Sequence, residues 1–158
     1  MQVGDIMHAD VKTANPEDTF ADVAKILHAN GISSIVVLDG QKLAGILTER
    51  DVVNLVAAGG DPHTTTVKMG MTRRHLETVS PRTDIVEAAE LMVSRNIRHL
   101  PVTDRGRVVG IVSIRDLTRW AAEELSGGHE LPDIHRSHAA LKAASELQRK
   151  RRTQSSSG

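Results

Sequence analysis

Two heptapeptides, GILTERD from Gly45 to Asp51 and GIVSIRD from Gly110 to Asp116, decide the fold. The offset of 65 residues between them also aligns residues 11–57 with residues 76–122 without a gap. This alignment contains eleven identities in 47 positions, whereas ordinary composition gives roughly three by chance. The chain therefore contains a duplicated unit, and the period is too long for one turn of a solenoid.

The first part of each copy predicts an extended stretch followed by an amphipathic helix. Residues 11–14 and 76–79 are the extended stretches, and Asp18 and Thr83 are the expected helix caps after a proline. Apolar residues then recur at the spacing of one helix face: Phe20, Val23, Ala24 and Leu27 in the first copy, and Ile85, Ala88, Ala89 and Met92 in the second. Gly31 and Asn96 follow at equivalent positions, where a left-handed residue ends a helix.

The second part of each copy predicts a β-hairpin and another helix. The runs SIVVL and LAGIL, and HLPVT and VVGIV, are typical of short strands, and DGQK and DRGR separate them as turns. The following helices are expected to begin at Thr48 and Ser113. Their inner faces should carry Val52, Leu55 and Val56, and Leu117, Trp120 and Ala121.

These patterns predict an α+β fold of two β-α-β-β-α repeats that pack through their sheets with pseudo-twofold symmetry. One copy alone cannot cover both faces of so small a sheet. We expect domain 1 at residues 1–60, domain 2 at residues 61–125, and a polar, basic, partly flexible helical tail at residues 126–158. The segments VGDIM and VKMGM resemble each other as short helices that lead into the repeats.

The start of each second helix has groups suited to a nucleotide. Unpaired N–H groups and the positive helix dipole favour a phosphate, and the Thr48 and Ser113 hydroxyls add donors. Asp51 and Asp116 offer carboxylates that can accept both hydroxyls of a ribose. The alternative is that Thr/Ser-x-x-Asp is only a capping box, although the two roles are compatible.

The two heptapeptides resemble the Gly-apolar-apolar-Thr/Ser-x-x-Asp signature of CBS domains. Their place in a duplicated unit makes residues 1–125 similar to a tandem CBS pair, or Bateman module, and HLPV from His99 to Val102 resembles the family's apolar-Pro strand. The resemblance implies a regulatory sensor that binds an adenine nucleotide (AMP, ADP or ATP) in the clefts between repeats and forms a homodimer. It also implies that Ile35, Val36, Leu100 and Pro101 hold the base.

The remaining candidate residues are two arginines and two threonines. Arg50 and Arg115 can pair with phosphate, or they can be surface or dimer-contact residues. Thr13 and Thr78, equivalent residues of the two extended stretches, complete the candidate nucleotide site.

The amino-acid composition argues against binding of nucleic acid or membranes. Lysine and arginine together number 20, as do aspartate and glutamate, so no net field attracts nucleic acid or a membrane surface. One Phe, one Trp and no Tyr cannot form a stacking surface for single strands. The sequence has no cysteine, which excludes disulfides, thiolate metal sites and a cysteine nucleophile but leaves the redox compartment open. It has no signal peptide pattern and no apolar run of 18 residues, so a cytoplasmic protein without membrane contact is expected.

The tail after Ser126 offers two alternatives to a solvated helix. His129, Asp133, His135 and His138 could suggest a metal site, but they form no closed ligand set, so no metal is expected. The basic residues 149–152 could bind an acidic partner or nucleic acid.

We expect no catalytic residues and no required cofactor, because no nucleophile–base pair or acid pair is evident. The expected partners are an adenosine-containing small molecule as ligand and an unidentified protein that the module regulates. The alternatives are a structural dimerisation module without ligand and an accessory protein that acts through the basic tail.

Overall fold

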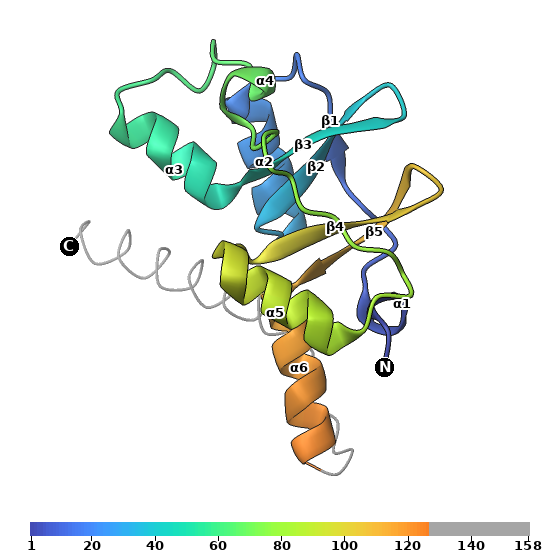
Figure 1. Ribbon diagram of the computed structural model, residues 1–158. Coiled ribbons are helices and arrows are strands. Elements are labelled where there is room, and N and C mark those ends of the chain that lie inside the picture. Colours follow the sequence, from blue (N-terminus) through green and yellow to red (C-terminus); the bar gives the residue numbers. More distant parts are fainter. Residues whose placement is uncertain (127–158) are drawn as a thin grey trace, which may run out of the picture. The chain divides into compact units, whose positions relative to one another are not determined.

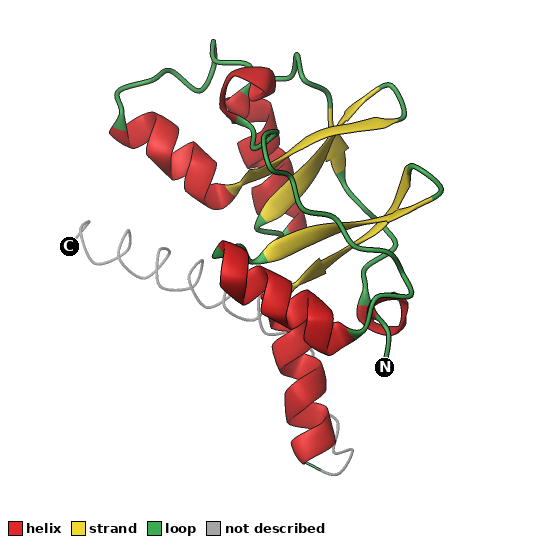
Figure 2. Cartoon of the chain, viewed as in Figure 1, coloured by secondary structure: helices red, strands yellow, loops and turns green. Residues whose placement is uncertain are grey.

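The computed structural model describes residues 1–126 of the 158. Residues Met1–Ala121 form one compact unit, which contains both repeats' hairpins and the residues of the candidate site. The first repeat contains β1 (Thr13–Ala14), α2 (Phe20–Asn30), β2 (Ser34–Asp39), β3 (Lys42–Thr48) and α3 (Glu49–Ala57) (Figure 1). The second contains α5 (Ile85–Arg95), β4 (His99–Asp104), β5 (Arg107–Ser113) and α6 (Ile114–Leu125). The expected α+β repeat is thus confirmed, while residues 127–158 of the predicted tail lie outside the described residues (Figure 2).

The first helix of each repeat is capped one residue later than predicted. Thr19 caps α2 by accepting the Asp22 N–H, and Asp84 caps α5 by accepting the Val86 N–H. The predicted caps were wrong because Asp18 and Thr83 use their side chains in the preceding turns, on the N–H groups of Asn15 and Ser80.

The helix ends are as predicted. Gly31 at φ 62° and Asn96 at φ 52° are both left-handed C-caps. These two residue types tolerate a positive φ with little strain, so the equivalent positions end both helices despite their different side chains.

Each repeat has one antiparallel hairpin. Ser34 pairs with Thr48 in β2–β3, and His99 pairs with Ser113 in β4–β5, so the same register holds in both repeats. The extended stretch before α2 adds a parallel strand, because Thr13 pairs with Val36. In the second repeat only Val79 makes the corresponding bridge, to Val102. The register therefore places the first residue of β2 beside the start of α3, and the first residue of β4 beside the start of α6.

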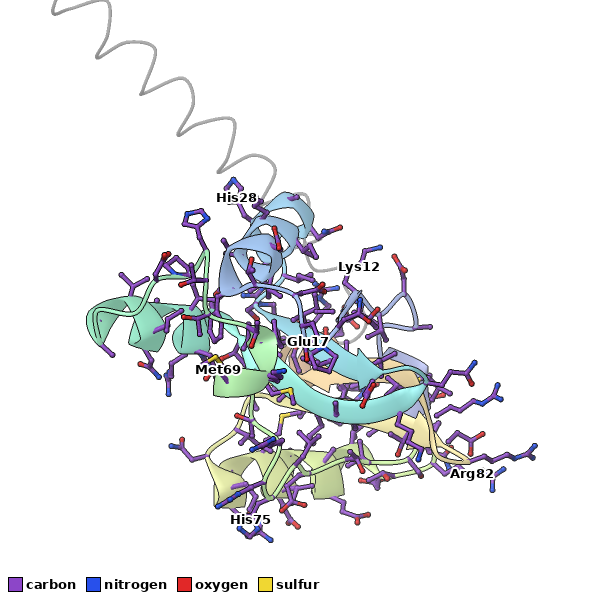
Figure 3. All side chains as sticks on the ribbon, turned by 90° about the horizontal axis from the view of Figure 1, so that it is seen from above. Lys12, Glu17, His28, Met69, His75 and Arg82 are labelled. Atoms are coloured by element: carbon purple, nitrogen blue, oxygen red, sulfur yellow. The ribbon has the colours of Figure 1, made fainter. Side chains whose placement is uncertain are left out.

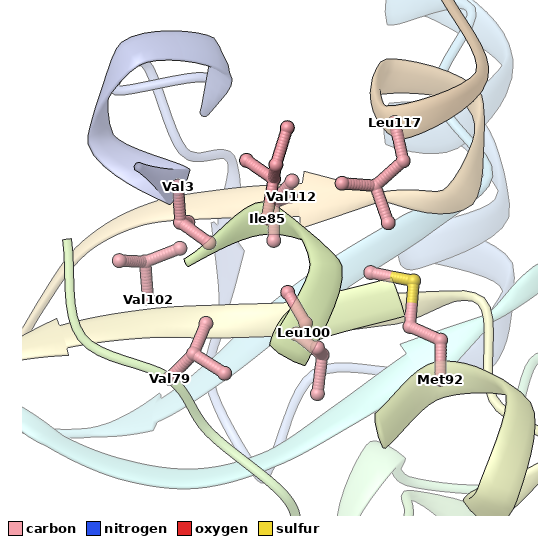
Figure 4. Close-up of a cluster of buried hydrophobic side chains, with 9 residues drawn as sticks. Val3, Val79, Ile85, Met92, Leu100, Val102, Val112 and Leu117 are labelled. Carbon is pink, nitrogen blue, oxygen red and sulfur yellow. The ribbon is translucent and has the colours of Figure 1, made fainter. Parts of the chain in front are cut away.

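The two repeats have separate apolar cores. The second is formed by side chains from both hairpin strands, both helices and the N-terminal segment (Figure 4): Val3, Val79, Ile85, Ala88, Met92, Leu100, Val102, Val112 and Leu117. The first core has the equivalent composition: Ala14, Phe20, Val23, Leu27, Ile35, Val37, Leu47 and Val67. Contacts between β3 and β5 join the two sheets, as the sequence predicted.

One predicted inner residue of α3 faces outward. Val52 and Leu55 pack against the first core, but Val56 is 58% exposed. None of the nine residues of α3 is fully buried, and Val56 lies beyond the narrow stripe that Val52 and Leu55 form against the core.

The two lead-in helices are exchanged between the repeats. The N-terminal α1 (Val3–Ile6) packs on the second repeat, where the Val3 N–H bonds the Thr83 carbonyl. The later α4 (Val67–Gly70) packs on the first, where the Val67 N–H bonds the Asp18 carbonyl. An ion pair of 2.6 Å from Lys68 to Glu17 adds to this contact. Figure 3 labels Glu17 and, on α4, Met69.

The signature glycines make this exchange possible. A Cβ atom at Gly45 would lie 2.7 Å from the Thr72 carbonyl oxygen, and one at Gly110 would lie 2.5 Å from the Met7 sulfur. Glycine therefore stands at these positions because the exchanged segment passes directly over the strand.

Candidate functional site

The start of α3 is closed by a reciprocal pair, Thr48 and Asp51. The Thr48 N–H and hydroxyl both donate to Asp51 Oδ2, at 2.7 and 2.9 Å, and the Asp51 N–H donates to Thr48 Oγ1 at 3.4 Å. This is a capping box, the alternative that the sequence left open. A carboxylate has about four lone-pair positions, so the bonds to Oδ2 leave Asp51 with capacity for a ligand.

The start of α6 repeats this geometry. The Ser113 N–H and hydroxyl donate to Asp116 Oδ2 at 2.7 and 2.6 Å, and the Asp116 N–H donates to Ser113 Oγ at 3.4 Å. Asp116 is more enclosed than its counterpart, with only 7% of its side chain exposed. The cap itself does not distinguish the two repeats.

His8 is the difference between them. Its Nε2 atom lies 2.9 Å from Asp116 Oδ1, the oxygen that the cap does not use. The hydrogen bond to Asp116 raises the pKa of His8, against burial and the charge of Arg119. Burial raises the pKa of Asp116, but the bonds from His8 and Ser113 outweigh it, so this pKa is lowered overall. The pair therefore favours imidazolium and carboxylate.

The helix starts are less open to a phosphate than the sequence suggested. The Glu49 N–H already donates to the Ser33 carbonyl at 3.0 Å, and the Ile114 N–H donates to the Arg98 carbonyl at 2.9 Å. With Asp51 and Asp116 also bonded through their N–H groups, two donors of each first turn are occupied. The expectation of unpaired N–H groups was wrong for these four, because the preceding strand and the cap satisfy them.

The candidate base-binding residues lie on two different faces. Ile35 and Leu100 belong to the two repeat cores. Val36 and Pro101, the next residues along each strand, point to the other face of the hairpin, because side chains alternate in a strand. All four are buried. Because Val36 and Pro101 belong to neither core cluster, these two are the candidates for contact with a base.

The candidate arginines and threonines are at the surface. Arg50 and Arg115 are exposed in the first turns of α3 and α6, and neither makes an ion pair within residues 1–126. Thr13 and Thr78 are exposed as well. Thr13 pairs with Val36, so it lies near the hairpin face that carries that residue.

His99 connects the repeats through Ser33. Its Nε2 atom lies 2.8 Å from Ser33 Oγ. Burial, reinforced by the nearby Arg98 charge, lowers the pKa of His99 to about 4, so the ring is neutral near pH 7. A neutral ring can donate or accept in this bond, depending on its tautomer.

His8 and Ser33 belong to the site but could not be predicted from their local sequence. His8 lies 108 positions from Asp116, and only the exchange of α1 brings the two together. The resemblance between VGDIM and VKMGM was the available signal, since similar lead-in segments should occupy similar places in the two repeats. Nothing local marks Ser33, because its partner comes from the other repeat.

Within residues 1–126, no three His, Cys, Asp or Glu side chains come together as a metal site. The histidines and Asp133 of the tail, and the basic residues 149–152, lie outside the described residues. No helix in the described part is long and apolar enough to cross a membrane.

Comparison with known proteins gives the family. The family model of the CBS domain matches twice, at residues 3–58 and 67–123. The chain belongs to the CBS domain family. Each match contains one capped Asp and the hairpin before it, so the resemblance seen in the two heptapeptides is confirmed.

Relatives of this CBS pair include short and long proteins. The CBS domain-containing protein YhcV of Bacillus subtilis is 31% identical over 132 residues, 84% of this chain and 94% of that protein. The chain spans 61% of protein MK0525 of Methanopyrus kandleri at 32% identity. It spans 22% of the inosine-5'-monophosphate dehydrogenase of Methanocaldococcus jannaschii, also at 32% identity.

Among solved structures, the CBS domain pair of protein MJ0100 is similar, with a TM-score of 0.73 and 30% identity. The likeness covers 78% of this chain and 98% of that one. That pair was solved in complex with 5'-methylthioadenosine and S-adenosyl-L-methionine. At least one CBS pair that is similar in structure to this chain therefore binds adenosine-derived molecules.

Proposed function

We propose that this CBS pair is a non-catalytic regulatory module that binds an adenosine-containing small molecule, such as AMP, ADP or ATP, in the clefts between its repeats. The ribose hydroxyls donate to the capped carboxylate of Asp51, and Asp116 is the equivalent group of the second repeat. The observation that carries the proposal is the duplicated capping box, which holds a carboxylate rigidly at the start of each second helix.

The geometry favours ribose recognition over phosphate recognition at these carboxylates. Asp51 Oδ2 is fixed by Thr48, so the other oxygen is oriented without further ordering. Because Glu49 and Asp51 already use their N–H groups, phosphate would depend on the helix dipole and on Arg50, which is exposed and can turn toward it. Among the four apolar candidates, Val36 and Pro101 are the residues proposed to contact the adenine base.

The relatives support the ligand class. MJ0100 binds two molecules that share an adenosine group. The match to part of inosine-5'-monophosphate dehydrogenase supports a role in which a CBS pair accompanies other activities. As a sensor of metabolite or energy state, the module would signal only if the ligand bound two arrangements of the repeats with different affinity.

The test is a thermal-shift series with AMP, ADP, ATP, 5'-methylthioadenosine and S-adenosyl-L-methionine. A ligand at a hundred times its Kd adds about 2.7 kcal/mol to the free energy of unfolding, which raises Tm by roughly 5–10 °C in a chain of this size. We expect at least one compound to produce such a shift in the wild type and Asp51→Ala to reduce it strongly.

Asp22→Ala is the matched control. Thr19 and Asp22 form a similar cap at the start of α2, with the Thr19 hydroxyl 2.8 Å from Asp22 Oδ2. Both variants lose a cap, which costs about 1 kcal/mol of stability, but only Asp51→Ala should lose the ligand-induced shift. A structural dimerisation module would show no shift with any of the five compounds. Equal loss in the two variants would attribute the effect to helix capping alone.

Self-association is a separate prediction from the family resemblance. A homodimer would have twice the 17.1 kDa mass of the chain, which light scattering after gel filtration measures directly. A cytoplasmic location and a regulated partner protein belong to the same proposal.

A further inference from the structure

The two signature carboxylates differ in one contact. Both Asp51 and Asp116 accept two hydrogen bonds at Oδ2 from their caps, at distances that agree within 0.3 Å. At Oδ1, Asp116 also meets His8 Nε2 at 2.9 Å. The difference comes from outside the repeat, since His8 belongs to the exchanged N-terminal segment.

Thr72 occupies the backbone position of His8 in the first repeat. His8 and Ile111 exchange two backbone hydrogen bonds, of 2.9 and 3.0 Å. Thr72 and Ile46 exchange the same two bonds, of 2.9 and 3.0 Å, and Ile46 is the repeat equivalent of Ile111. A side chain at position 72 therefore begins where the His8 side chain begins relative to its own repeat. Threonine is shorter than histidine and carries no charge. Thr72 therefore gives Asp51 no counterpart of the imidazolium that His8 places beside Asp116.

The His8 contact is positioned to compete with a ligand. Asp116 is 7% exposed and His8 is 46% exposed, so the carboxylate is enclosed while the ring bonded to its Oδ1 atom still reaches solvent. A ribose diol needs acceptor capacity on the oxygen that the cap leaves, and His8 takes part of it. The charge of Arg119 acts on His8, and Asp116 is influenced by the His8 charge and by hydrogen bonds from the neutral Ser113. The neighbouring His99 is neutral near pH 7 and adds no charge.

We infer that His8 is a specificity-determining residue that closes the second ribose carboxylate. A molecule with a vicinal diol then binds first at Asp51, and it binds at Asp116 only where His8 turns away. This inference rests on the proposed nucleotide function and adds which of the two repeats takes the ligand. It makes the two halves of a symmetric fold unequal through one side chain.

Equilibrium dialysis with labelled AMP, ATP and 5'-methylthioadenosine tests the inference, because it measures the number of sites and each affinity. For the wild type we expect one tight site per chain, which Asp51→Ala removes. In His8→Ala a second site should tighten about tenfold, the equivalent of one charge-assisted hydrogen bond. His8→Gln, whose amide can still donate to the carboxylate without a charge, should lie between the two.

The reciprocal variant is Thr72→His, which places an imidazole opposite Asp51. It should weaken the first site about tenfold, whereas the control Thr72→Ala should leave its affinity unchanged. Circular dichroism and Tm of each variant establish that the fold is retained.

The outcomes separate the two proposals. Binding that needs Asp51 but ignores both His8→Ala and Thr72→His would leave the nucleotide function standing and overturn the role of His8. Two equal sites in the wild type, or loss of the second site in His8→Ala, would also overturn it, the latter because His8 would then be a ligand contact. Failure of all three compounds to bind any variant would overturn the nucleotide function and this inference with it.

Discussion

The Oγ atom of Ser33 lies 2.8 Å from the Nε2 atom of His99, and this bond joins the first repeat to the second. Ser33 directly precedes β2, and its own carbonyl accepts the first N–H of α3, from Glu49. His99 is the first residue of β4, and the carbonyl of the preceding Arg98 accepts the first N–H of α6, from Ile114. The contact therefore couples the two helix starts through the sheets rather than through the linker.

Ser33→Ala should lower the free energy of unfolding by about 1 kcal/mol, because it leaves a partly buried ring nitrogen without its partner. Urea denaturation measures this change. Ser94→Ala is the control, since the Ser94 hydroxyl bonds the Leu91 carbonyl of its own helix at an exposed position. Equal effects of the two substitutions would show that the bond between repeats adds nothing.

Acid should destabilise the protein through His99. Its pKa is about 4 in the folded protein and about 6.5 in an unfolded chain, so between these values the unfolded chain binds more protons. Stability therefore falls as pH falls from about 6.5 toward 4. His99→Gln, which cannot titrate, should flatten this part of the stability curve. An NMR titration that gives His99 a pKa near 6.5 would contradict the account.

The stabilisation from the pair of His8 and Asp116 is lost as pH rises, whereas the effect of His99 appears as pH falls. The pKa of His8 is raised on folding, so its stabilisation is fully present below about 6.5 and is lost as pH rises through the raised value. The lowered pKa of Asp116 limits the window on the acid side, where protonation of the carboxylate removes the pair. His8→Ala should consequently lower Tm more at pH 6 than at pH 9. A loss of Tm that is constant over this range would refute the charged pair.

Gly110→Ala should cost about 1–3 kcal/mol by overpacking, because the new Cβ would meet the Met7 sulfur. If this contact is the cause, Met7→Ala should relieve it. The double variant Met7→Ala/Gly110→Ala should then be more stable than the sum of the single effects predicts. Additive effects in urea denaturation would mean that glycine is required there for another reason.

The elements of this fold could be predicted because their signals are local. Gly31 and Asn96 end equivalent helices, and the alternating runs before Thr48 and Ser113 form the hairpins with equal register. The predicted caps were one residue away from the observed caps, Thr19 and Asp84. Two neighbouring polar residues compete for each cap position, and the preceding turn uses the side chain of the first one.

The site was only partly predictable because it depends on contacts between distant segments. Thr48 with Asp51, and Ser113 with Asp116, lie three residues apart, so their pairing follows from the helix itself. His8 reaches Asp116 only through the exchange of the lead-in helices, and the N–H groups of Glu49 and Ile114 are satisfied by strand residues of the hairpin. A motif of seven residues contains neither relationship.

The central claim is that an adenosine-containing ligand binds at the capped start of α3. An NMR titration of the 15N-labelled protein with AMP, ATP and 5'-methylthioadenosine tests it most directly, through the backbone amide signals of residues 48–51. The account predicts that these signals shift with saturation, led by Arg50, and that the shifts vanish in Asp51→Ala but persist in Asp22→Ala. Saturable shifts confined to other elements, with residues 48–51 unchanged, would contradict it.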